Sequence, residues 1–169
     1  MKAINNILIV GLITLLTSCG EAPFYEKSVS FDNREWKDNV KPSFKIKVDD
    51  IKTPYDFKLS LRTSTDYKYS NLWIFLKTTT PDGTTAREPY QIPITNDDGS
   101  WIGEKSGSVV TSNLTFSSRK LPKKGNYTFT VELGITESTI DEVHDLTFTV
   151  DKNLQEIRAS NHKTTTVRV

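Results

Sequence analysis

Apolar and polar residues alternate with a period of two through much of this chain. In residues 55–61, every second side chain is apolar and those between are charged or polar. The same alternation recurs in residues 44–48, 127–133 and 146–150. Successive side chains of a strand point to opposite faces of a sheet, so this pattern predicts strands with one buried face and one face in water.

Turn signals separate these strands from others. After the turn at Pro81-Asp82-Gly83 the chain returns through residues 84–94. Pro89 and Pro93 interrupt that segment, and because proline cannot donate to a sheet ladder they predict an edge strand or a loosely paired one. Residues 24–31 and 109–116 are expected to form further strands.

Two segments are less regular. Residues 72–76 are apolar at every position, which predicts a central strand covered on both faces, with Trp73 in the core. Residues 138–143 are compatible with one helical turn.

About eight strands with regular turns predict an all-β fold, an antiparallel β-sandwich of the immunoglobulin-like or jelly-roll type. We expect residues 24–151 to form this domain. Residues 152–169 are polar, and we expect them to form a poorly ordered C-terminal tail.

The N-terminal residues 1–18 have the organisation of a lipoprotein signal peptide. Lys2 supplies a positive charge, and the apolar run that follows is about ten residues long, too short for a span of roughly 20. Two small residues precede Cys19, as a lipoprotein signal peptidase requires. We therefore expect lipidation of Cys19, a tether over residues 19–23, and a lipid bilayer as the first partner; the alternative is a secretory signal with a chance cysteine.

Charge and cysteine content narrow the function. Cys19 is the only cysteine, which excludes an intramolecular disulfide and a cysteine-rich metal site. The chain has 22 basic and 21 acidic residues, so nothing favours nucleic acid as a partner.

Candidate chemistry is sparse. A catalytic triad would depend on His144 alone, since His162 lies in the expected tail, and we expect His144 to be a solvated loop residue. Asp97 and Asp98 could ligate calcium, but the alternative is a turn in which an Asp side chain bonds the backbone two residues on. We therefore expect no catalytic residues, metal or cofactor, and no enzyme.

Aromatic residues suggest a binding role. Five of them could stack on sugars, as in a glycan-binding lipoprotein of a carbohydrate uptake system, although aromatics also fill sandwich cores. These are Trp73, Trp101, Tyr67, Tyr69 and Tyr90.

The loop from Asp97 to Gly107 is the segment that we expect to carry a protein contact. It places Trp101 after a turn, near Asp97 and Asp98, and exposed aromatics concentrate interface energy. The alternative is that Trp101 plugs one end of the sandwich.

Three motifs follow one another along the chain: Tyr67-Lys68-Tyr69-Ser70-Asn71-Leu72, then Thr78-Thr79-Thr80-Pro81-Asp82-Gly83, then Asp97-Asp98-Gly99-Ser100-Trp101-Ile102-Gly103. Together with the lipoprotein signal that ends at Cys19, their order and spacing resemble the GldH family, the gliding motility lipoproteins of Bacteroidetes-type bacteria. The resemblance extends from Cys19 to about Val150. The resemblance implies a non-enzymatic accessory lipoprotein of the cell envelope. Its partners would be other envelope proteins of the gliding motility and associated protein-secretion machinery.

Overall fold

The structure is a computed structural model that describes residues 22–154. Eight of the strands in this part are six residues or longer, and three are short. The elements in chain order are β1 (Tyr25–Ser30), the 3-10 turn η2 (Asp32–Arg34), β2 (Trp36–Lys37), β3 (Ser43–Val48), β4 (Tyr55–Ser64), β5 (Asn71–Thr79), β6 (Thr85–Pro93), β7 (Glu104–Ser106), β8 (Val109–Arg119), β9 (Gly125–Leu133), β10 (Thr139–Ile140) and β11 (Val143–Lys152).

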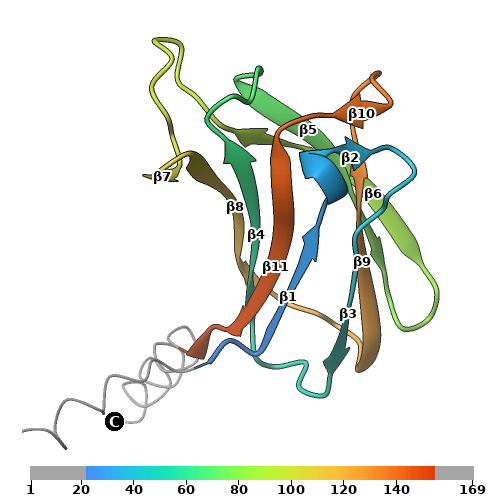
Figure 1. The fold of residues 1–169 in the computed structure, drawn as a ribbon. Helices are drawn as coiled ribbons and strands as arrows, with labels where there is room; N and C mark the ends of the chain where they lie inside the picture. The colour runs from blue at the N-terminus through green and yellow to red at the C-terminus, as the bar shows by residue number, and fades with distance from the viewer. Residues whose placement is uncertain (1–21, 155–169) are drawn as a thin grey trace, which may run out of the picture.

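The long strands form two antiparallel sheets that pack face to face (Figure 1). One sheet has the order β1-β11-β4-β8-β7 and the other has the order β3-β9-β5-β6. Consecutive long strands lie in opposite sheets, except for the hairpin β5–β6. This alternation is the jelly-roll arrangement, so the structure selects one of the two sandwich types that the sequence left open.

The core lies between the sheets and is filled by the inward residues of the alternating strands. In β4, Phe57, Leu59 and Leu61 are buried, as the period of two predicts. Phe129 and Phe148 meet at the centre, with ring centres 5.1 Å apart. Each such side chain contributes roughly 1.5–3 kcal/mol through burial, which explains why the alternation selects this sheet packing.

The expectation that residues 72–76 are covered on both faces is wrong. Trp73, expected in the core, is 44% exposed on the outer face of β5. Leu72 and Ile74 point inward and are buried. The outward ring of Phe75 is covered instead by the side chain of Arg87, whose guanidinium carbon lies 3.4 Å from the ring centre. A long polar side chain on the neighbouring strand therefore supplies the cover that a second protein layer was expected to provide.

Residues 138–143 do not form a helical turn. Thr139 and Ile140 form β10, which pairs with β2, and β11 begins at Val143. His144 is not a solvated loop residue: it is a half-buried residue of β11, at a bulge where the pairing with β4 shifts. The buried side chains of Ile140 and Val143 explain the extended conformation, because each is needed in the core.

The sandwich has two distinct ends. We call the end formed by loops 49–54, 80–84 and 120–124 the proximal end, because Tyr25 pairs with Val150 there and both ends of the described chain leave from it (Figure 1). Lys152, expected in the tail, is the last residue of β11. The opposite, distal end carries loops 65–70, 94–103 and 134–142. No helix within the described part has the length and apolar character to cross a bilayer.

Candidate functional site: a groove at the distal end

Two loops that are remote in sequence are joined at the distal end. The carbonyl oxygen of Ser70 accepts the backbone N–H groups of Ile94 at 2.9 Å and Thr95 at 3.0 Å. Ile102 N–H then donates to the carbonyl of Ile94 at 2.9 Å, and Thr95 pairs with Trp101. The loop between β4 and β5 and the connection from β6 to β7 therefore form one unit.

The turn within this connection orders Asp98. Gly99 has a φ of +81°, a left-handed conformation that glycine adopts at no steric cost. Asp98 Oδ1 accepts the backbone N–H of Ser100 at 2.9 Å and its hydroxyl at 2.6 Å. These two bonds hold the pKa of the Asp98 carboxyl below its usual value. Asp98 thus bonds the backbone two residues on, the alternative to calcium ligation that the sequence left open.

Gly103 allows the connection to lie directly against β8. A Cβ added at this glycine would lie 2.1 Å from the carbonyl oxygen of Thr111, far inside van der Waals contact. Only a residue without a side chain permits this approach. The two glycines of the Asp97–Gly103 motif are therefore required for different reasons. Gly99 allows the turn, and Gly103 allows the close contact with β8.

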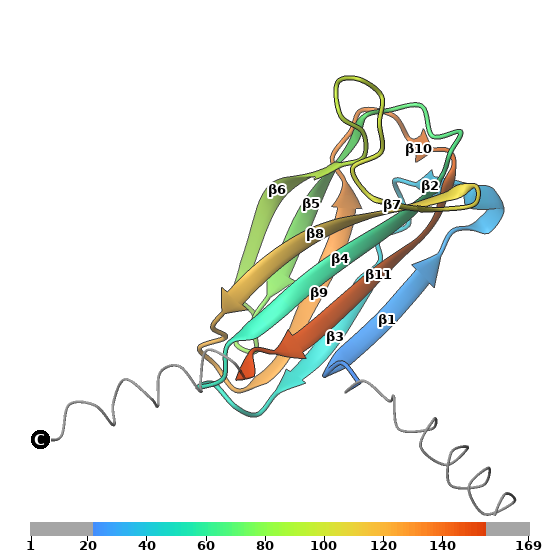
Figure 2. The ribbon, with the colours of Figure 1, turned by 90° about the vertical axis from the view of Figure 1, so that its left-hand side faces the viewer.

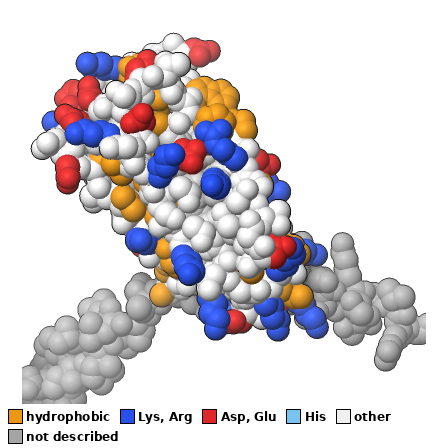
Figure 3. Space-filling view, turned by 90° about the vertical axis from the view of Figure 1, so that its right-hand side faces the viewer, with side chains coloured by type: hydrophobic (Ala, Val, Ile, Leu, Met, Phe, Trp, Pro, Cys, Tyr) orange, Lys and Arg blue, Asp and Glu red, His pale blue; other side chains and the backbone are white. Residues whose placement is uncertain are grey.

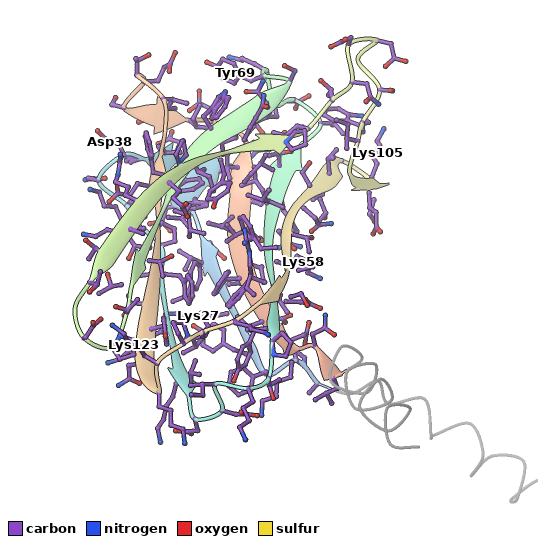
Figure 4. The ribbon with its side chains drawn as sticks, turned by 180° about the vertical axis from the view of Figure 1, so that it is seen from behind. Lys27, Asp38, Lys58, Tyr69, Lys105 and Lys123 are labelled. Atoms are coloured by element: carbon purple, nitrogen blue, oxygen red, sulfur yellow. The ribbon has the colours of Figure 1, made fainter. Side chains whose placement is uncertain are left out.

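A groove of about 530 Å³ lies between the two loops, and we call it the distal groove. Tyr67 is buried beneath it, and its hydroxyl donates to the carbonyl of Asn71 at 3.3 Å. Burial raises the pKa of the Tyr67 hydroxyl above its ordinary value. The ring of Tyr69 meets that of Tyr67 edge-on, 5.7 Å away, and is 48% exposed at the distal end (Figure 4).

The predicted contact residues take three different positions in this groove. Asp97 is exposed and lines it, whereas Asp98 is engaged within the turn. Trp101 is half-buried: it packs against the core and also lines the groove. The position of Trp101 therefore has features of both alternatives, since the residue packs against the end of the sandwich and is also accessible from the groove.

The sequence grouped Tyr67 and Tyr69 with Trp101 only as candidates for sugar stacking, and it assigned the protein contact to the loop from Asp97 to Gly107 alone. The signal was present, since both segments were recognised as motifs, but nothing local brings them together. The remaining motif, Thr78–Gly83, lies elsewhere. Its Asp82 is in the β5–β6 turn at the proximal end, where Lys123 donates to its carboxylate. That bond is the main reason why the pKa of Asp82 is lowered.

The five aromatics considered for sugar stacking do not form one platform. Tyr67, Tyr69 and Trp101 line the distal groove. Trp73 lies on the outer face of β5, and Tyr90 packs edge-on against Phe116, with ring centres 4.8 Å apart.

Within residues 22–154, His144 forms no ion pair with a carboxylate, as a triad would require. The buried carboxylate of the adjacent Asp145 accepts two bonds from Arg62 Nε, at 3.0 and 2.9 Å. His144 Nε2 is buried without a hydrogen-bond partner in residues 22–154. No three His, Cys, Asp or Glu side chains in that same span are grouped as a metal site would need. Cys19 and His162 lie outside the described residues.

The jelly roll and the distal groove define a protein built on a β-sandwich with a groove at one end. A family model, that of the GldH lipoprotein, matches residues 23–150. The chain belongs to the GldH lipoprotein family.

Individual relatives agree with this assignment. The chain is 24% identical to a gliding motility lipoprotein GldH homolog of Christiangramia forsetii over 147 residues, which is 86% of this chain and 90% of the relative. It is 25% identical to the gliding motility lipoprotein GldH of Flavobacterium johnsoniae over 138 residues, covering 82% and 86% of the two chains.

Solved structures resemble the chain only distantly. The VP2 subviral particle of infectious bursal disease virus matches with a TM-score of 0.35 at 11% identity, over 79% of this chain and 34% of the viral chain. The chain thus spans about a third of that protein. A likeness at this level carries no argument about fold or function.

Proposed function

We propose that this protein is a membrane-anchored, non-enzymatic accessory lipoprotein of the gliding motility and associated protein-secretion machinery. It acts through protein contacts made at the distal groove. The observation that carries the proposal is the convergence of two sequence motifs, residues 67–72 and 97–103, on one groove at the end of the sandwich farthest from the proposed anchor. The family and the names of its members supply the process.

The proposed anchor sets the orientation of the domain. Cys19 precedes Ala22, the first described residue, by three positions, so even a fully extended chain separates them by no more than about 11 Å. The proximal end is therefore held against the bilayer. Lys and Arg side chains gather around that end (Figure 3), where they suit a surface with anionic lipids. The distal groove then faces away from the membrane, toward other envelope proteins.

Charge suggests the chemistry of the partner. Loops 65–70, 94–103 and 134–142 of the distal end carry six carboxylates and a single lysine, Lys68. Glu142 is paired with Arg34, and Asp98 is engaged within its turn. The groove itself therefore presents Asp97 beside Lys68. The remaining excess of negative charge lies in the surrounding loops and favours a partner surface with basic residues, because complementary charges steer association. Tyr69 would be the aromatic anchor in that contact.

Photo-crosslinking in the native envelope tests this proposal. A photoreactive amino acid placed at Lys68 should crosslink to an envelope protein, and Tyr69→Ala should reduce the yield at least about tenfold with the melting temperature nearly unchanged. Trp73→Ala is the matched control, since Trp73 is as exposed as Tyr69 but lies outside the groove. Equal crosslinking in the two variants, together with normal gliding and secretion in cells that carry Tyr69→Ala, would reject the distal groove as the contact.

A glycan ligand is the alternative occupant of the groove. It is favoured by the exposed ring of Tyr69 beside Asn96 and Asp97, since sugars stack on aromatic faces and bond to such polar groups. Titration with glycans, monitored by the fluorescence of Trp101 in a Trp36→Phe, Trp73→Phe background, distinguishes a glycan ligand from a protein partner. Saturable binding that Tyr69→Ala abolishes would support the glycan role.

A further inference from the structure

A second cavity opens between the two sheets, well away from the distal groove. We call it the lateral pocket; its volume is about 260 Å³. It lies between β6 and β8, which belong to different sheets and share no ladder in the described part (Figure 2). Its floor is formed by Phe57, Phe129 and Phe148, whose ring centres lie 5.1–5.9 Å from one another.

The lateral pocket is one place where the core remains accessible from outside. Most core side chains are 0–1% exposed, but Phe57 and Phe129 keep 5% and Leu76 and Leu121 keep 8%. All four line this pocket. An apolar cavity of about 150 Å³ is enough to hold benzene, so the larger lateral pocket has room for a longer hydrocarbon.

The rim of the pocket is polar and carries more positive than negative charge. Arg119, at the end of β8, and Lys120 face it together with Glu88. The Glu88 carboxylate accepts a hydrogen bond from the Tyr90 hydroxyl at 3.1 Å and keeps its charge, so the three groups together carry one net positive charge. Neither Arg119 nor Lys120 forms an ion pair with a carboxylate of residues 22–154.

The position of Tyr90 supports this view of the rim. Its ring packs edge-on against Phe116 across the gap between the sheets. Burial and the bond to Glu88 raise the pKa of Tyr90, whereas the charge of Arg119 acts in the opposite direction. The Arg119 guanidinium is therefore within electrostatic range of the pocket mouth.

We propose that the lateral pocket binds a fatty acid, with the acyl chain against Phe57, Phe129 and Phe148 and the carboxylate paired with Arg119 and Lys120. An apolar cavity with a few polar groups at its mouth is the usual form of a small-molecule site. An anionic head group is the one that complements two cations, and carboxylates pair with guanidinium in a defined geometry. This site is independent of the contact proposed for the distal groove, which lies at the other end of the sandwich.

Photolabelling tests this site. The full chain, purified from membranes and placed in nanodiscs of phosphatidylcholine, is irradiated with a palmitic acid that carries a diazirine in its chain, and labelled peptides are identified by mass spectrometry. The expected labels fall on the segments of Leu76, Phe116 and Leu121, and excess unlabelled palmitate removes them. The Arg119→Glu, Lys120→Glu variant should lose about tenfold in labelling, since it repels the carboxylate.

Matched controls keep the test decisive. Lys27→Glu, Lys58→Glu makes the same change of charge on exposed strand positions outside the pocket and should label as the unmodified chain does (Figure 4). The methyl ester of the same photoreactive acid should label the pocket segments weakly. Three results would overturn the proposal. They are the absence of label from those segments, equal labelling by the acid and the ester, and undiminished labelling of the Arg119→Glu, Lys120→Glu variant.

Discussion

Arg87 and Glu132 bond to each other across an intervening strand. Arg87 Nε on β6 donates to Glu132 Oε2 on β9 at 2.9 Å, and between them the guanidinium lies over the ring of Phe75 on β5. One side chain thus connects three neighbouring strands on the outer face of the sheet. This contact matters because β6 is an edge strand with prolines at positions 89 and 93, where it lacks backbone donors.

Replacing Arg87 should loosen β6. Arg87→Ala removes an ion pair and a cation–π contact, both partly exposed, and should lower the free energy of unfolding by about 1 kcal/mol. Urea denaturation measures this loss. Arg87→Lys keeps the charge but not the planar contact with Phe75, so its stability should lie between those of the unmodified protein and Arg87→Ala. An Ala variant as stable as the unmodified protein would show that the contact adds nothing to stability.

The same contact predicts a pH dependence. The bond from Arg87 is the main cause of the lowered pKa of Glu132, and the charge of Lys41 adds to it. A carboxyl whose pKa is lowered by folding stabilises the folded state at pH values above its ordinary pKa of 4.5. That stabilisation is lost as the pH falls from 4.5 through the lowered pKa. In Glu132→Gln, the decrease in stability on acidification should be smaller. Identical acid titrations of the two proteins would contradict this prediction.

Leu59→Asp should unfold the domain. Leu59 lies mid-strand in β4 and is fully buried, and an unpaired carboxylate there costs several kcal/mol, a large share of a total stability of about 5–15 kcal/mol. Lys58→Glu, the exposed neighbour, should be tolerated. Circular dichroism melting curves of the two variants measure the difference, and similar curves would mean that the assigned inward face of β4 is incorrect.

Gly103→Ala should destabilise the fold by about 1–3 kcal/mol through overpacking, since the added Cβ would meet the carbonyl of Thr111. The adjacent and exposed Glu104→Ala serves as the control. Thermal denaturation compares the two. If Gly103→Ala retains the full melting temperature, the connection does not lie against β8 as described.

Cys19→Ser should release the protein from membranes. The change removes the thiol that the acyl chains require, and two or three chains together provide stable anchoring. Incorporation of labelled palmitate and fractionation of the envelope measure the effect. Palmitate that is still incorporated into the serine variant would refute Cys19 as the lipidated residue.

The local pattern of the chain determined where the long strands lie and, in those whose residues alternate, which side is buried. The alternation in β3 and β4 and the edge position of β6 follow from residues close together in sequence. The reason is that a strand has a period of two, and a proline lacks its donor, whatever the strand's neighbours are.

Tertiary pairing decided what those local signals leave open. The order of the strands, and hence the jelly roll, depends on partners more than a hundred residues away, as when β1 pairs with β11. Residues 67–70 meet Trp101 because Ser70 bonds Ile94 and Thr95 across a sheet end. The short strand β7 exists because it pairs with β8, and Trp73 is exposed because nothing in residues 22–154 forms a second layer over β5 there. Long-range pairing is a property of the folded chain as a whole, since each register is selected by the core that all strands build together.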